Sequence, residues 1–260
     1  MHVVALQFEK NAGDALAVRL AAVLGRTLLE ARNRVSDPEG GPSVLATFPE
    51  KTAAEAYAEE LRSRGFSVVV LPPEDVESDK ERFVVRSFEL GPGGLTAQAR
   101  QGSAEVPWQD VRLLLRGQLR VEQKLTKTAT RREFSLQRAV LTHGLMVTRS
   151  VKETKHELRV EHNGFLHLYR ATGKPLVFRQ HELSYAGLGP GLQHSVAANF
   201  SLLVAALRKA SPRATYDERL ATAPGQARLL GSLPAASHLD VAISLVSRSL
   251  LAGSLGVSSK

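Results

Sequence analysis

The sequence predicts an α+β protein: a small β-α-α-β-α-β module, followed by a mainly antiparallel β domain with a C-terminal helix. Within residues 1–76, short β-branched runs alternate with segments of helical period. After a polar, proline-bearing linker at 72–80, strand-like runs separated by glycine turns take over. An amphipathic helix pattern at 195–209 closes this second part. We therefore expect domains at 1–76 and 81–210, and a loop with a last helix at 211–260.

The N-terminal module is predicted from its alternating elements. The β-branched runs predict strands at 2–8, 43–48 and 66–71. Helical spacing and cap residues predict helices at 14–24, 27–35 and 49–64. Thr27, with Glu30 three residues later, has the spacing of a capping box, and Gly65 is placed to end the third helix.

The second domain is predicted from strand patterns and turn residues. GPGG at 91–94 indicates a hairpin turn. Strands are expected at 82–90, 95–100, 104–116, 157–160, 164–170 and 175–183, with a short turn at 108–110. The segment 117–160 shows no sustained period and is predicted to be a basic insertion: a long loop, an exposed hairpin or a helix. Residues 211–236 are predicted to be loop, and 238–252 a helix that packs on the body or binds a partner.

Two segments of the first module resemble a known family. LGRTLLEARNRV at 24–35 and TAAEAYAEELRSRGFSVVV at 52–70 resemble the ribosomal stalk protein L7/L12 C-terminal domain. The ClpS adaptor family has the same fold. The resemblance covers residues 2–72 and implies a protein-binding or regulatory module. Thr27 replaces that family's second glycine and the ClpS motifs are missing, so binding to elongation factors or degradation signals is not implied.

The second domain has its own resemblance. A glycine-glycine-leucine turn at 93–95 and VPWQDVRLLLRG at 106–117 resemble the bacterial pleckstrin-homology-like proteins. This resemblance implies a β barrel capped at one end by a helix. Lipid binding does not follow from such a fold, because fold alone does not set function.

Composition excludes several chemistries. The chain has 260 residues and no cysteine, which excludes disulfides, thiolate nucleophiles and cysteine-ligated zinc. The N-terminus lacks a signal-peptide pattern, and no apolar run is long enough to cross a membrane. A cytoplasmic location without a transmembrane segment is therefore expected.

Positive charge is concentrated in the middle of the chain. The net charge is +8, and residues 119–160 hold 10 basic and 4 acidic side chains. An anionic partner, either nucleic acid or acidic phospholipid, is one interpretation; an ordinary solvated basic face is the other. Phe134 is the one aromatic residue between Trp108 and Phe165, which disfavours stacking on single strands. The candidate anion-binding residues are Arg116, Arg120, Lys124, Lys127, Arg131, Arg132, Arg138, Arg149, Lys152, Lys155 and Arg159.

No catalytic, cofactor or metal motif is found. Phosphate-binding glycine loops and nucleophile elbows are missing, and the eight histidines form no HxH or HxxxH pair. The leading hypothesis is a non-enzymatic regulatory or adaptor protein that binds another protein. The alternatives are anionic-surface binding through 116–159 and, third, an enzyme whose residues converge only in three dimensions. Partner identity and oligomeric state stay open.

Overall fold

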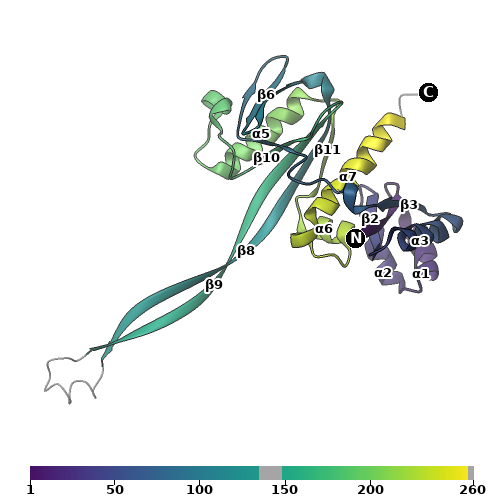
Figure 1. Cartoon of the computed structure of the whole chain (residues 1–260), viewed down its shortest axis with the longest axis horizontal. Helices are drawn as coiled ribbons and strands as arrows, with labels where there is room; N and C mark the ends of the chain where they lie inside the picture. Colours follow the sequence, from purple (N-terminus) through teal and green to yellow (C-terminus); the bar gives the residue numbers. More distant parts are fainter. Residues whose placement is uncertain (135–147, 257–260) are drawn as a thin grey trace. The chain divides into compact units, whose positions relative to one another are not determined.

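The computed structural model describes residues 1–134 and 148–256, with side chains for 1–119 and 163–252. The chain divides into two compact units, Met1–Leu119 with Asn163–Lys260, and Arg120–His162. The fold is α+β with mostly antiparallel sheets and a helix toward the C-terminus, as the sequence predicts (Figure 1). The elements are β1 (His2–Phe8), α1 (Gly13–Leu24), α2 (Leu28–Arg34), β2 (Gly41–Phe48), α3 (Lys51–Ser63), β3 (Ser67–Leu71), η1 (Pro73–Asp75), β4 (Phe83–Val85), β5 (Ser87–Leu90), β6 (Gly94–Ala99), β7 (Gly102–Pro107), η2 (Trp108–Asp110), β8 (Val111–Phe134), β9 (Thr148–Arg170), β10 (Leu176–Arg179), η3 (Ala186–Gly191), α5 (Val196–Ala210), β11 (Thr215–Leu220), α6 (Ala223–Leu230) and α7 (Ala235–Gly256).

The N-terminal β-α-α-β-α-β order is confirmed. Its antiparallel sheet has the strand order β2-β1-β3, with β1 in the centre. Strand alternation gives this sheet two buried faces: Val4 and Leu6 pack with helices α1, α2 and α3. Val3 and Ala5 belong to a different core, which is described below. The capping box is also present, with the Glu30 amide donating to Thr27 Oγ1 at 3.2 Å.

The second part contains two sheets. β5, β6 and β7 form an antiparallel meander, whose predicted turn is closed by the Gly91 amide donating to the Gly94 carbonyl at 2.9 Å. The other sheet has the order β11-β8-β9-β10-β4, and its two edge strands pair in parallel with their neighbours. The predicted strand 82–90 is two strands, β4 and β5, which enter different sheets. Leu203 and Leu207 of α5 complete the core between these sheets.

One sequence prediction is wrong, and for another the structure decides among the alternatives. The loop predicted at 211–236 is wrong, because it contains β11 and α6. Pro224 signalled a loop, yet it sits in the first turn of α6, where the Thr222 side chain caps the helix and proline is tolerated. Of the alternatives for 117–160, paired strands occupy 117–134 and 148–160. The rest of that segment lies outside the described residues.

Helix α7 packs back on the body. Five apolar residues of α7 are buried in one core: Val241, Ala242, Ile243, Leu245 and Val246. The same core contains residues of the N-terminal sheet and of the sheet that includes β8. Val3 and Val44 reach this core from the N-terminal sheet, and Leu113 and Leu115 from β8. Within the described residues no single helix could span a membrane; only α6 and α7 together pass on length and composition, with a 74° bend between them.

The predicted linker at 72–80 is anchored to the body. The Glu77 amide donates to Ser244 Oγ of α7 at 2.9 Å, and Tyr169 Oη donates to the Glu77 carboxylate at 2.9 Å. Arg248, also in α7, pairs with Asp75 at 2.7 Å. The linker therefore lies along α7, and this contact fixes where the next residues of the chain lie.

The shared core predicts how the protein unfolds. Leu245 is almost fully buried in the core shared by the N-terminal sheet and the sheet that contains β8. Leu245→Ala should therefore lower the free energy of unfolding by about 2–5 kcal/mol in a single urea transition. The exposed Leu192, changed in the same way, should have little effect. Two separate transitions, only one of them shifted by Leu245→Ala, would contradict a shared core.

Candidate functional site

The structure places most of the predicted anion-binding residues on two neighbouring strands. Arg116 lies in β8 with its side chain partly exposed, and its Nη1 is 3.8 Å from a Glu218 carboxylate oxygen. β8 also contains Arg120, Lys124, Lys127, Arg131 and Arg132, and β9 contains Arg149, Lys152, Lys155 and Arg159. Arg138 lies outside the described residues. β8 and β9 are hydrogen-bonded neighbours, so these basic positions are brought onto one pair of strands.

We call the described strand residues of the second unit, 120–134 and 148–162, the basic ribbon. Strand β10 pairs with β9 only from Phe165 to Leu168, and β11 pairs with β8 only from Leu113 to Gly117. In the part of the chain that the structure describes, no third strand flanks the ribbon. Fifteen residues of strand span about 50 Å, and Figure 1 shows the two strands twisting around each other.

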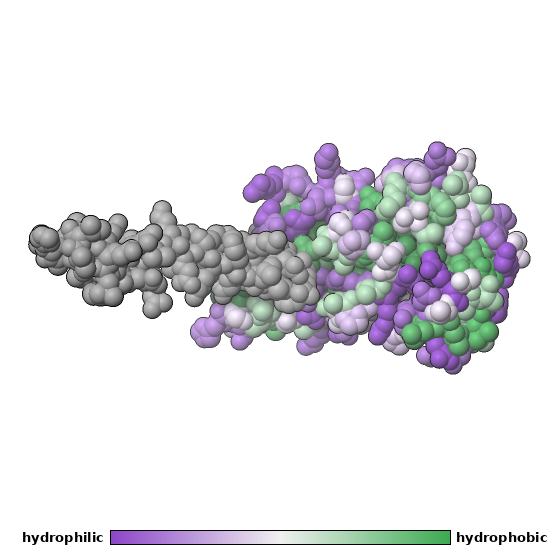
Figure 2. Space-filling view, turned by 90° about the horizontal axis from the view of Figure 1, so that it is seen from below, coloured by the Kyte–Doolittle hydropathy of each residue, from purple (hydrophilic) through white to green (hydrophobic). Residues whose placement is uncertain are grey.

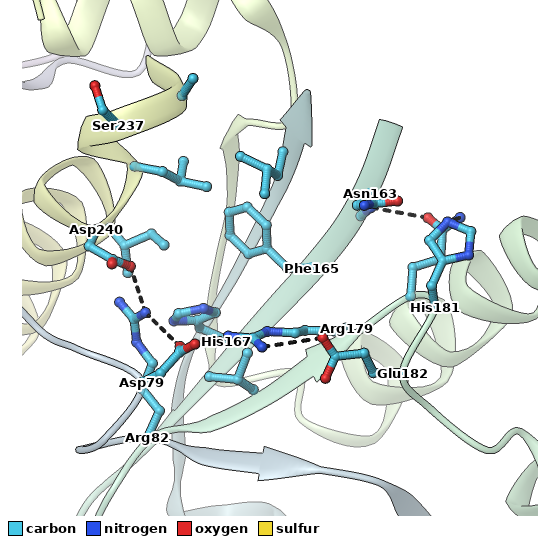
Figure 3. A pocket seen from close by; sticks show the side chains of 17 residues that line it. Asp79, Arg82, Asn163, Phe165, His167, Arg179, His181, Glu182, Ser237 and Asp240 are labelled. Carbon is cyan, nitrogen blue, oxygen red and sulfur yellow. Dashed lines mark hydrogen bonds and ion pairs between the residues drawn. The ribbon is translucent and has the colours of Figure 1, made fainter. Parts of the chain in front are cut away.

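A second candidate site is a cavity of about 370 Å³ in the first unit. We call it the Arg82 cavity. β9 and β10 form one wall, the first half of α7 faces them, and the linker end at 79–82 closes one side (Figure 3). The polar residues that line it are Asp79, Arg82, Asn163, His167, Arg179, Gln180, His181, Glu182, Ser237 and Asp240.

Arg82 is the most buried charge of this cavity, with only 3% of its side chain exposed. Its Nη1 donates to Asp240 at 2.6 Å, and Asp79 lies 3.4 Å from the same nitrogen. Burial lowers the pKa of Arg82, but the hydrogen bond and charge of Asp240, with Glu77, raise it above its ordinary value. The guanidinium therefore stays charged. Its Nη2 and Nε make no hydrogen bond, and a Glu77 carboxylate oxygen lies 3.7 Å from Nε.

His167 lies beside Arg82 and Arg179 and is almost fully buried. Burial, and then the charges of Arg82 and Arg179, hold the pKa of His167 well below its ordinary value, so the ring is neutral. Its Nδ1 has no partner either. Phe165 and Tyr169 flank the ring on the same face of β9, with centroids at 5.3 and 6.2 Å.

The sequence alone did not bring the residues of this cavity together. The available signal was a histidine inside the apolar strand GFLHLYR, where alternation places it on the face with Phe165 and Tyr169. The partner from α7 could not be found this way, because Asp240 is 158 residues away from Arg82 in the sequence. No group of three or more potential metal ligands occurs among the described residues.

The surface offers a less definite feature. Figure 2 shows one face, on which hydrophobic residues gather in several groups between hydrophilic ones.

No protein-family model, no curated protein and no solved structure matches the chain. The resemblances to the L7/L12 C-terminal domain, to ClpS and to the pleckstrin-homology-like proteins therefore stay predictions, and the site must be judged on its own geometry.

The neutral buried His167 predicts a pH dependence of stability. Above about pH 6.5 the imidazole is neutral in both the folded and the unfolded chain. Below this pH, His167 binds a proton in the unfolded chain but not in the folded one. The free energy of unfolding therefore falls by up to about 1.4 kcal/mol per pH unit, until the pH reaches the lower pKa of His167 in the folded chain.

His167→Phe should remove that contribution, whereas Tyr169→Phe, which keeps the histidine, should leave it in place. Urea unfolding of the three proteins between pH 7.5 and 5 measures the difference. Equal pH slopes for the original protein and His167→Phe would show that His167 is not held neutral.

Proposed function

We propose that this protein is a non-enzymatic binding protein whose basic ribbon contacts the phosphate backbone of duplex nucleic acid. The observation that carries the proposal is a pair of long neighbouring strands with a strong excess of positive charge and, among the described residues, no third strand beside them. Residues 120–162 hold 10 basic and 5 acidic side chains.

The ribbon's length supports a role beyond folding. β8 has 24 residues and β9 has 23, although strands in globular proteins average about five or six. A two-stranded ribbon is marginally stable in water, and its open edges are prone to aggregation. Scattered lysines can protect such edges, but edge protection does not require twice as many basic as acidic side chains. Charge of this density suits a polyanion.

Composition favours a duplex among the polyanions. The major groove is wide enough to admit a two-stranded β-ribbon. Single-strand binding relies on aromatic stacking, and Phe134 is the one aromatic residue in 120–162. Insertion into a membrane surface would also use aromatic anchors. Threonines at 126, 128 and 130 add hydroxyl groups of the kind that contact phosphates.

An adaptor role is the second candidate. It is favoured by apolar side chains that the N-terminal module leaves exposed: 54% of Val18, 38% of Leu28 and 69% of Leu29 are accessible. These residues lie on α1 and α2, the pair of helices that covers one face of the first sheet with α3. A protein partner that still binds when residues 120–162 are removed would favour this candidate.

The duplex proposal predicts a steep salt dependence that neutralising ribbon charges reduces. We compare the original protein with a variant in which Lys124, Lys127, Arg131 and Arg132 are all changed to Gln. If each contacts one phosphate, the slope of log affinity against log salt should fall by about 3–4. Fluorescence anisotropy with a labelled 30-base-pair DNA measures the affinity between 50 and 300 mM salt.

A matched control removes the same charge elsewhere. Lys51, Arg100, Lys209 and Arg213 are exposed residues of the first unit, and changing them to Gln should leave the salt slope almost unchanged. Two results would contradict the proposal: undetectable binding of the original protein at 50 mM salt, or equal loss in both variants. Preference for single strands or for anionic vesicles over the duplex would identify a different partner.

A further inference from the structure

We propose that the Arg82 cavity binds a small neutral molecule with a planar amide group, which Arg82 and His167 recognise together. The inference goes beyond duplex binding and does not depend on it. It rests on buried polar atoms without partners, on the balance of charge around them, and on the apolar wall beside them.

The unpartnered atoms are complementary to an amide. Buried polar groups almost always have hydrogen-bond partners, so each exception asks for an explanation. The Arg82 Nη2 group is a donor without an acceptor, Nε has only a Glu77 oxygen beyond hydrogen-bond distance at 3.7 Å, and His167 Nδ1 has no hydrogen-bond partner either. When the neutral imidazole carries its hydrogen on Nε2, Nδ1 is an acceptor. An amide carbonyl accepts from the guanidinium while the amide N–H donates to the imidazole.

The charges at this end exclude an anion. Each guanidinium already has a carboxylate: Arg82 pairs with Asp240, and Arg179 pairs with Asp79. Glu182 adds another acid, within 3.3 Å of Arg179. A carboxylate ligand would have to displace one of these partners. A cation gains nothing at the Arg82 end, since the free groups there are donors on a positive charge. A neutral group satisfies the free donors without altering the balance.

The apolar side chains of the cavity suit the rest of such a molecule. Leu239 and Ile243 of α7 line the cavity, as do Phe165 of β9 and Val177 of β10. Figure 3 shows Phe165 above His167, with Asp240 on one side and Asn163 and His181 on the other. The volume of about 370 Å³ lies within the range of small-molecule sites. An apolar ring can lie against these side chains while its amide reaches Arg82.

Three isosteric probes test the inference: benzamide, which is neutral, benzoate, an anion, and benzamidine, a cation. Saturation-transfer NMR with the full chain at pH 7.5 measures each one. Benzamide should bind, and the two charged probes should bind about tenfold more weakly, the order of one lost buried hydrogen bond. Backbone amide shifts around Gly164 and His167 should move with benzamide.

Variants separate this site from other binding. His167→Phe should weaken benzamide binding about tenfold, whereas His181→Phe, at the far end of the cavity, should retain it. Ala236→Trp narrows the cavity at an exposed position of α7, so it should block binding while the thermal midpoint stays unchanged. A cavity that holds only water would show no benzamide binding, and this result overturns the inference. Preference for benzoate, or full binding by folded Ala236→Trp, also overturns it.

Discussion

The packing of α7 against two sheets is the constraint on which the first unit depends. The N-terminal sheet has apolar side chains on both faces, and its own three helices cover only one of them. The second face is buried by residues of α7, which also cover apolar residues of β8 and β9. Without α7, both sheets would expose apolar side chains to water, at a cost of roughly 25 cal/mol for each Å². The N-terminal segment and the C-terminal helix therefore stabilise each other.

This packing also creates the Arg82 cavity. Glu77 and Asp75 attach the linker to α7, and the chain then enters the body at Arg82. Asp240 of α7 meets the guanidinium there, so the buried charge has a partner from across the sequence. Burying an arginine costs free energy that only such partners offset. The free donors that remain on Arg82, beside a neutral His167, distinguish this cluster from a purely structural ion pair.

Local signals predicted most of the first module and less of the second. Capping and turn residues, such as Thr27 with Glu30 and the glycines at 91–94, identify their elements because the physics is confined to a few neighbouring residues. The strand at 215–220 was missed because its sequence, TYDERL, is polar, and its place beside β8 is set by tertiary pairing. The ribbon was left among three alternatives, since its residues lack the alternation that a half-buried strand shows.

The two candidate sites differed in how far sequence could reach them. The basic residues are close along the chain, so their charge could be counted, and the structure then places them on two neighbouring strands. The cavity combines residues from the linker, β9, β10 and α7, and no local pattern joins these segments. His167 was visible as a histidine in an apolar strand, but only the structure places it beside Arg82 and leaves Nδ1 without a partner.

We propose that the first unit folds around α7 without the ribbon, while the ribbon carries duplex binding. The most direct measurement replaces residues 120–162 with an Asn-Gly turn, which is suited to joining two antiparallel strands. Thermal unfolding and DNA anisotropy are then measured on the shortened chain. We predict an almost unchanged unfolding midpoint and loss of duplex binding. An unfolded chain would contradict the first half of the claim, and a folded chain that still binds the duplex would contradict the second.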